Sequence, residues 1–131
     1  MTNANVPSGA SSDIVDALVI SLLAVNNYQL DKAWALLPSL KSNGLTDPAQ
    51  VAGADVGDLT VRLASAGYDR GMLTGLFAER LRQLMISVLS EAFGGLRDAI
   101  QANDQKKFSD LFCAFPGVGP RVCSNAWLLL K

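Results

Sequence analysis

The sequence predicts an all-α protein, a compact multi-helix bundle or barrel of about seven or eight helices. Half of its 131 residues are hydrophobic, which is enough to bury a real core in one domain. Apolar residues recur at helical spacing along most of the chain, and no segment alternates with period two for long enough to form a strand. No internal repeat or linker divides the chain. We therefore expect a flexible tail over residues 1–11 and a single domain over residues 12–131.

Four helices are predicted in the first half of the chain. Each has apolar residues on one face, and each is bounded by residues that cap or break helices. The boundary residues are Ser12 or Asp13 before the first helix and Asn26-Asn27 after it, Pro38 at the end of the second, Asp47-Pro48 at the start of the third, and Asp55 and Gly67 around the fourth.

Four more helices are predicted in the second half. A long helix from Asp69 to about Ala92 is expected to end at Gly94-Gly95, and a short segment over residues 96–102 follows. Asp104 is placed to cap the next helix, and the last helix begins at Pro120. The long helix should turn one apolar face inward, formed by Leu73, Leu76, Phe77, Leu81, Leu84 and Val88.

The segment Phe115–Val122 joins the last two predicted helices and carries the clearest chemical signal. Glycines at two of its positions allow unusual backbone angles and close approach of another molecule, and the proline fits the first turn of a helix. Free N–H groups at a helix N-terminus favour an anion such as a phosphate. The candidate DNA-binding residues of this hairpin, residues 115–121, are Pro116, Gly117, Val118, Gly119, Pro120 and Arg121. The alternative is an ordinary glycine-rich turn between two helices.

The charge balance limits any affinity for nucleic acid. Eleven Lys and Arg residues against twelve Asp and Glu residues give a net charge of −1, whereas DNA-binding domains commonly carry a basic excess. DNA contacts must therefore be local and weak. Lys106 and Lys107 near the hairpin are candidates for such contacts, and a solvated helix face is the alternative reading of this pair.

The hairpin resembles the helix-hairpin-helix motif of the DNA glycosylases of the endonuclease III superfamily, which reads apolar-Pro-Gly-Val/Ile-Gly. The resemblance extends over residues 13 to 130, because five segments agree in order with the six-helix barrel of that superfamily. It implies a barrel half that holds double-stranded DNA by its backbone. The segments are Leu22-Leu23-Ala24-Val25-Asn26, Asp31-Lys32-Ala33-Trp34, Thr46-Asp47-Pro48-Ala49-Gln50-Val51, Ala66-Gly67-Tyr68 and the helix from Asp69.

Departures from that family argue against catalysis in this chain alone. Bifunctional members carry a lysine where this sequence has Arg121, and a guanidinium cannot form the Schiff base of a lyase. Members also carry a catalytic aspartate shortly beyond the final helix, and this sequence reaches Lys131 before such a segment. The polar residue that many members wedge into DNA would fall near Asn26, for which the alternative is a residue that ends a helix.

No other catalytic constellation stands out. The sequence has no histidine, which excludes His-based triads and His-ligated zinc. We expect Cys113 and Cys123 to be reduced and to pack in the helices beside the hairpin. Carboxylate pairs such as Asp55/Asp58 fit helix capping. The sequence thus predicts no catalytic residue, no metal site and no cofactor.

The expected function is weak, sequence-nonspecific binding of double-stranded DNA. Two alternatives stay open: an active DNA glycosylase whose aspartate comes from elsewhere, and a protein-interaction module with a protein partner in place of DNA. The polar N-terminus lacks the features of a signal peptide, and no apolar run is long enough to span a bilayer. We therefore expect a cytoplasmic protein, nucleoid-associated or nuclear if DNA-bound, and neither secreted nor membrane-bound.

Overall fold

A computed structural model describes residues 13–25 and 28–131. Within these ranges the chain forms nine α-helices and one short 3-10 helix, with no strand. The predicted tail over residues 1–11 and Ser12, Asn26 and Asn27 lie outside the described ranges. The elements are α1 (Ile14–Leu23), α2 (Leu30–Ala35), α3 (Leu37–Ser42), α4 (Pro48–Ala52), α5 (Val56–Ser65), η1 (Gly71–Leu73), α6 (Thr74–Val88), α7 (Ala92–Gln101), α8 (Gln105–Phe112) and α9 (Pro120–Leu130).

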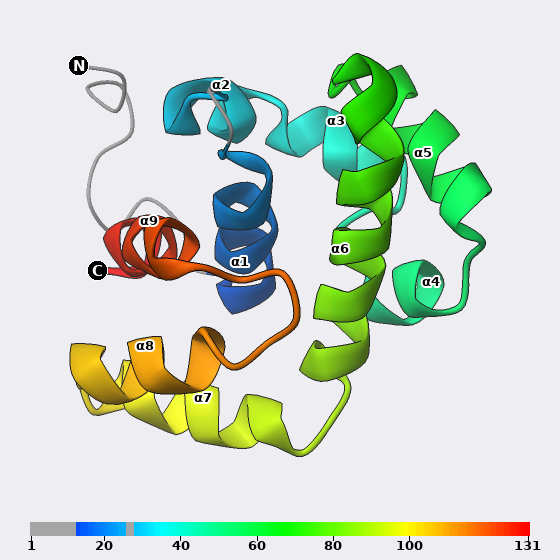
Figure 1. The fold of residues 1–131 in the computed structure, drawn as a ribbon. Helices are drawn as coiled ribbons and strands as arrows, with labels where there is room; N and C mark the ends of the chain where they lie inside the picture. The colour runs from blue at the N-terminus through cyan, green and yellow to red at the C-terminus, as the bar shows by residue number, and fades with distance from the viewer. Residues whose placement is uncertain (1–12, 26–27) are drawn as a thin grey trace.

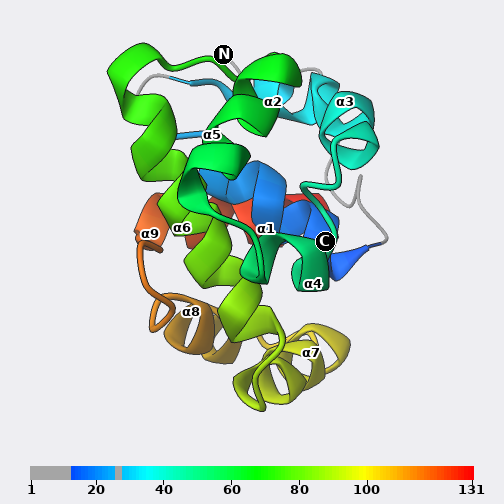
Figure 2. The same cartoon turned by 90° about the vertical axis from the view of Figure 1, so that its right-hand side faces the viewer.

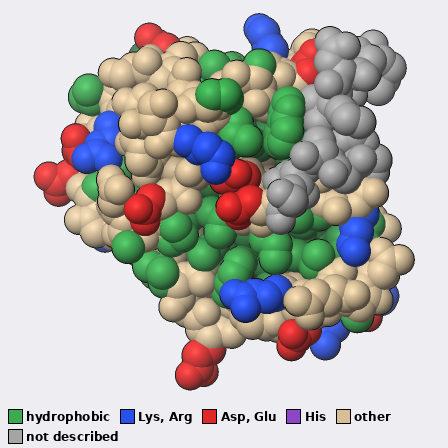
Figure 3. Space-filling view, turned by 180° about the vertical axis from the view of Figure 1, so that it is seen from behind, with side chains coloured by type: hydrophobic (Ala, Val, Ile, Leu, Met, Phe, Trp, Pro, Cys, Tyr) green, Lys and Arg blue, Asp and Glu red, His purple; other side chains and the backbone are tan. Residues whose placement is uncertain are grey.

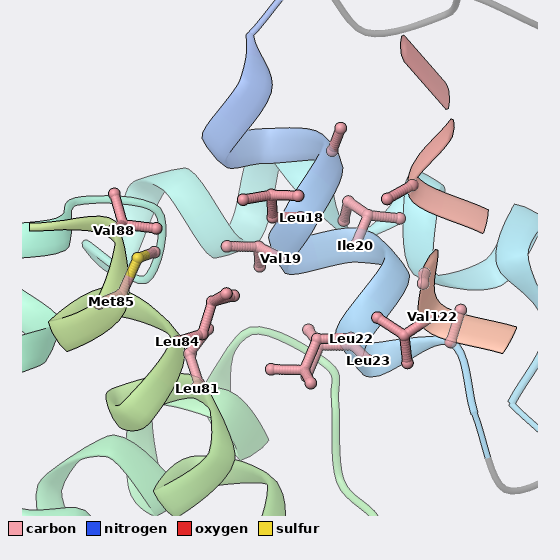
Figure 4. Close-up of a cluster of buried hydrophobic side chains, with 14 of the residues drawn as sticks. Leu18, Val19, Ile20, Leu22, Leu23, Leu81, Leu84, Met85, Val88 and Val122 are labelled. Carbon is pink, nitrogen blue, oxygen red and sulfur yellow. The ribbon is translucent and has the colours of Figure 1, made fainter. Parts of the chain in front are cut away.

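Helix α1 is the buried centre of the fold (Figure 1). Every residue from Asp16 to Leu23 is buried, because α6 packs on one side of α1 and α9 on another. Figure 4 shows leucines and isoleucine of α1 facing Leu81 and Leu84 of α6 and Val122 of α9. Each such side chain contributes about 1.5–3 kcal/mol of transfer free energy when fully buried. The most apolar helix of the chain is thus the one that the other helices surround.

The polar groups of α1 all have partners. Asp13 caps the helix by accepting a hydrogen bond from the N–H of Val15 at 2.9 Å. The buried carboxylate of Asp16 pairs with the Lys41 ammonium at 2.8 Å, and this hydrogen bond raises the pKa of Lys41. A buried charge is costly without such a partner, so the pair fixes α3 against the first turn of α1.

The boundaries of α2 to α5 follow their cap and breaker residues. Pro38 occupies the second position of α3, so the chain breaks after α2 and starts a separate helix. The Asp47 carboxylate accepts hydrogen bonds from two N–H groups of α4, as predicted.

The end of α5 is marked by a glycine. Gly67 follows α5 with φ of 102°, and the Tyr68 N–H donates to the Leu63 carbonyl at 2.9 Å. These are the features of a Schellman ending. The predicted cap Asp55 stands at the N-cap of α5, although its side chain makes no capping bond there.

The prediction for the glycine pair after α6 is wrong. Gly94 and Gly95 do not end the long helix; they lie inside the first half of α7, whereas α6 stops at Val88. A Cβ on Gly95 would lie in ordinary contact with Leu111, 3.5 Å from its methyl group, and a Cβ on Gly94 would meet nothing within 4 Å. Gly95 thus lies at the contact between α7 and α8, which pair at the bottom of Figure 1.

The predicted inward face of α6 is only partly correct. Phe77, Leu81 and Leu84 are fully buried, whereas Leu73 and Leu76 are each 42% exposed. Leu73 belongs to the 3-10 helix η1, so it does not follow the period of the α-helix, whereas Leu76 lies in the first turn of α6. The rest of α6 is covered by α4 and α5, which pack against it on one flank (Figure 2).

Candidate nucleic-acid interface

The segment between α8 and α9 is a tight turn with a buried anchor. The Val118 N–H donates to the Phe115 carbonyl at 3.2 Å, Pro116 takes the second position, and Gly117 takes the third with φ of 79°. This is the pattern of a type II turn, which needs glycine at its third position. The Phe115 ring is buried and meets the Phe112 ring edge-on, with 5.5 Å between centroids. The turn is therefore held from below by the core.

The two glycines of the hairpin have different environments. The φ of Gly117 favours glycine, and a Cβ there would also lie 3.1 Å from Arg80 Cγ, so the Arg80 side chain would have to shift slightly. Gly119 is the N-cap of α9 with φ of −112° and ψ of −179°, an extended conformation open to any residue. A Cβ there would meet nothing within 4 Å. The expectation that Gly119 needs an unusual backbone angle is wrong; its lack of a side chain only leaves the space beside it open.

Backbone N–H groups of the hairpin and of the first turn of α9 lie beside the open space at Gly119. In the described part of the chain, the N–H groups of Gly117 and Gly119 have no hydrogen-bond acceptor. The first intrahelical bond of α9 is from the Cys123 N–H to the Gly119 carbonyl, at 3.1 Å. The N–H groups of Arg121 and Val122 come before Cys123 in the first turn, so they have no carbonyl partner within α9, and no side chain caps them. Three of these donors, on Gly119, Arg121 and Val122, thus stand at the positive end of the α9 dipole, and the fourth belongs to the turn before it.

Two arginines complete a pocket of about 460 Å³ at this place. Arg121 is exposed at the start of α9, and Arg80 reaches the pocket from α6 with its guanidinium 5.5 Å from the Phe77 ring centroid. Neither makes an ion pair among the described residues, and no carboxylate lines the pocket there. The residues lining it are Val25, Arg80, Gly117, Gly119, Pro120, Arg121 and Val122.

A third arginine, Arg70, holds the segment that follows α1, where Val25 lines the pocket. Arg70 Nη1 donates to the Val25 carbonyl at 3.2 Å and to Tyr68 Oη at 2.9 Å. Tyr68 Oη in turn donates to the Leu23 carbonyl at 2.6 Å. The Arg70 guanidinium also lies 5.1 Å from the ring centroids of Tyr28 and Phe77. Burial raises the pKa of Tyr68 to about 12, against the opposing effect of Arg70.

Among the described residues, the predicted contacts Lys106, Lys107 and Val118 do not line the pocket. Lys106 and Lys107 lie in the first turn of α8, whereas the hairpin follows its last turn. Eight helical residues separate these ends by about 12 Å. Lys106 is also paired with Asp110 at 3.2 Å. Val118 is half-buried against the core, and Asn26 lies outside the described residues, next to Val25.

The contribution of Arg80 was missed by the sequence reasoning. It belongs to the polar face of α6, and helical periodicity assigns it to the outside without saying which surface lies beside it. Only the packing of the hairpin against α6 brings it to Gly117. A signal in the sequence is its place three residues after Phe77, where a long cation can lie over an aromatic ring.

On the face opposite to the view of Figure 1, the basic side chains of the described residues are scattered among acidic ones, and apolar side chains gather over the middle of the view (Figure 3). Within residues 13–25 and 28–131 no group of three His, Cys, Asp or Glu residues could hold a metal ion. No helix in these ranges is long and apolar enough to cross a membrane.

Comparison with known proteins gives no match: no family model, no curated protein and no solved structure is similar to this chain.

Proposed function

We propose that the chain binds the backbone of double-stranded DNA, weakly and without sequence specificity, at the pocket before α9. The observation that carries the proposal is the combination, within the described part of the chain, of four free N–H donors with two arginines that have no acidic neighbour in the pocket. A phosphate has acceptor oxygens and negative charge for both. Among the residues that the structure describes, no carboxylate or lysine lines the pocket, which favours binding without base excision or lyase chemistry.

The number of cations sets the expected salt dependence. Two arginines predict a slope of log Kobs against log salt of about −2, which is a loss of roughly tenfold between 50 and 200 mM salt. A site that also used Lys106 and Lys107 would have a slope near −4 and would lose roughly a hundredfold. The slope therefore counts the cations in contact with phosphate.

The test is a fluorescence-anisotropy titration of a short DNA duplex at low salt, with the parent and two variants. Gly119→Asp places a favoured N-cap on α9 and should leave the fold intact. Its carboxylate would occupy the N–H donors and repel phosphate, so we expect at least a tenfold loss of affinity. The matched control is Lys106→Ala/Lys107→Ala, which should bind within about twofold of the parent and keep its slope.

Circular dichroism and thermal unfolding check that all three proteins are folded. Loss of affinity in the lysine variant alone would assign the contact to α8 and refute the hairpin site. Absence of binding by the parent at low salt would refute the DNA proposal altogether.

A protein-interaction module is the second candidate, and one observation favours it. Large apolar side chains are exposed in α5 and in η1: Val61 is 65% exposed and Met72 is fully exposed. Exposed apolar side chains that gather into a patch are common in surfaces that bind other proteins. A parent chain that folds but does not bind DNA would favour this candidate.

A further inference from the structure

The two cysteines of the chain meet across the base of the hairpin. Cys113 follows the last turn of α8, and Cys123 lies in α9. Their Sγ atoms are 2.6 Å apart, although the thiols are free and ten positions separate them in sequence. Formation of a disulfide would bring the sulfurs closer by only about 0.6 Å.

We propose that Cys113 and Cys123 are a reversible modification site, at which a low-molecular-weight disulfide of the glutathione class oxidises them to an intramolecular disulfide. The proposal does not depend on DNA binding. It rests on the juxtaposition of two thiols by α8 and α9, which pack against each other, while α9 also packs against α1.

The difference in exposure decides the order of the steps. Cys113 is half-buried, whereas Cys123 is 2% exposed. Burial, together with the Cys113 thiol beside it, raises the pKa of Cys123. Cys113 is therefore the thiol that meets the oxidant, and Cys123 is the resolving thiol.

The reaction balances with the small disulfide as the oxidant. The Cys113 thiolate attacks one sulfur of the small disulfide, a mixed disulfide forms, and one small thiolate leaves. The Cys123 thiolate then attacks Cys113 Sγ, the protein disulfide forms, and the second small thiolate leaves. The protein loses two protons and two electrons, and the small disulfide is reduced to two thiols. Excess reduced thiol runs the same steps backwards.

The cross-link would close a short loop that contains the whole hairpin. The closed loop runs from Cys113 to Cys123, and a loop of this length is expected to raise the melting temperature by about 10 °C if the native geometry accepts the bond without strain. The hairpin would then be tied to α8 and α9 at its base as well as through the Phe115 ring.

The test is incubation of the folded chain with oxidised glutathione, followed by acid quenching and mass spectrometry without reduction. We expect the intact mass to fall by two hydrogen atoms, a cross-linked peptide that joins Cys113 and Cys123, and return of both thiols on addition of dithiothreitol. The matched variant Cys123→Ser should instead keep glutathione on Cys113, because no resolving thiol remains. Thermal unfolding of the oxidised parent should show the higher melting temperature.

Three outcomes would overturn the proposal. One is stable glutathionylation of Cys113 in the parent, which would show that Cys123 does not attack. Another is a disulfide-linked dimer as the main product. The third is two thiols that stay free at an excess of oxidised glutathione, while an unfolded sample reacts.

Discussion

Gly117 and Gly119 lie two residues apart in the hairpin, and the same substitution should have opposite effects at the two positions. Gly117→Ser puts a side chain at φ of 79° and within 3.1 Å of Arg80 Cγ, so we expect the free energy of unfolding to fall by about 1–2 kcal/mol. Gly119→Ser adds a favoured N-cap in open space and should leave this free energy unchanged or raise it by a few tenths.

Urea denaturation of the two variants measures the difference directly. Equal losses at both positions would show that Gly119 is needed for the turn itself. The sequence alone treats the two glycines alike, because backbone angles are not written in the residue type.

Tyr68 should make the fold sensitive to alkaline pH. Its pKa is about 12 in the folded chain because of burial, against about 10 in an unfolded chain. Below pH 10 the phenol is neutral in both states, and its contribution to stability is fully present. Between pH 10 and 12 the unfolded state ionises first, so about 2–3 kcal/mol of stability should be lost as the pH rises.

Tyr68→Phe is the matched variant for this test. It removes the hydroxyl that bonds to the Leu23 carbonyl, so it should be less stable at neutral pH. Its melting temperature should nevertheless fall less steeply than that of the parent from pH 10 to 12. Parallel slopes in the two proteins would assign the alkaline sensitivity to other groups, of which Tyr28 also has a raised pKa.

At the level of elements, α7 is the helix whose composition least favours it. Gly94 has open space around its missing Cβ, and glycine inside a helix costs roughly 0.5–1 kcal/mol relative to alanine. Gly94→Ala should therefore raise the free energy of unfolding by about that amount, measured by urea denaturation.

Gly95→Leu is the contrasting variant at the neighbouring position. Gly95 faces Leu111 across the contact between α7 and α8, and a large side chain there should cost about 1–3 kcal/mol through overpacking. A destabilised Gly94→Ala would contradict this account and would mean that α7 needs the freedom of its glycines.

Helix boundaries could be predicted from the sequence where the signal is local. Asp13, Asp47 and Asp104 cap their helices as expected, because a capping bond involves residues two or three positions away. The end of α6 and the start of α7 could not be predicted from local residues. No cap residue marks them. Of the two glycines that suggested a boundary, Gly95 lies at the contact with Leu111, whereas Gly94 has open space around it.

For the whole molecule, the all-α class and most of the core followed from composition and periodicity. The candidate site followed only in part. The hairpin residues are adjacent in sequence, and their turn was predicted. Arg80 comes from α6 and Val25 from the end of α1, and their meeting with the hairpin depends on how distant helices pack. The contact between the sulfurs of Cys113 and Cys123 could not be predicted for the same reason, because it depends on how α8 and α9 pack.

The burial of α1 between α6 and α9 also bears on how the protein is made. On a ribosome α1 is synthesised before α9, and the other helices of the described residues lie between them in sequence. At about 5–20 residues per second, the apolar side of α1 that α9 covers waits of the order of 5–20 s for its partner. The nascent chain therefore cannot complete its core helix by helix from the N-terminus. Until α9 emerges, the most apolar segment of the chain is a target for chaperones and for aggregation.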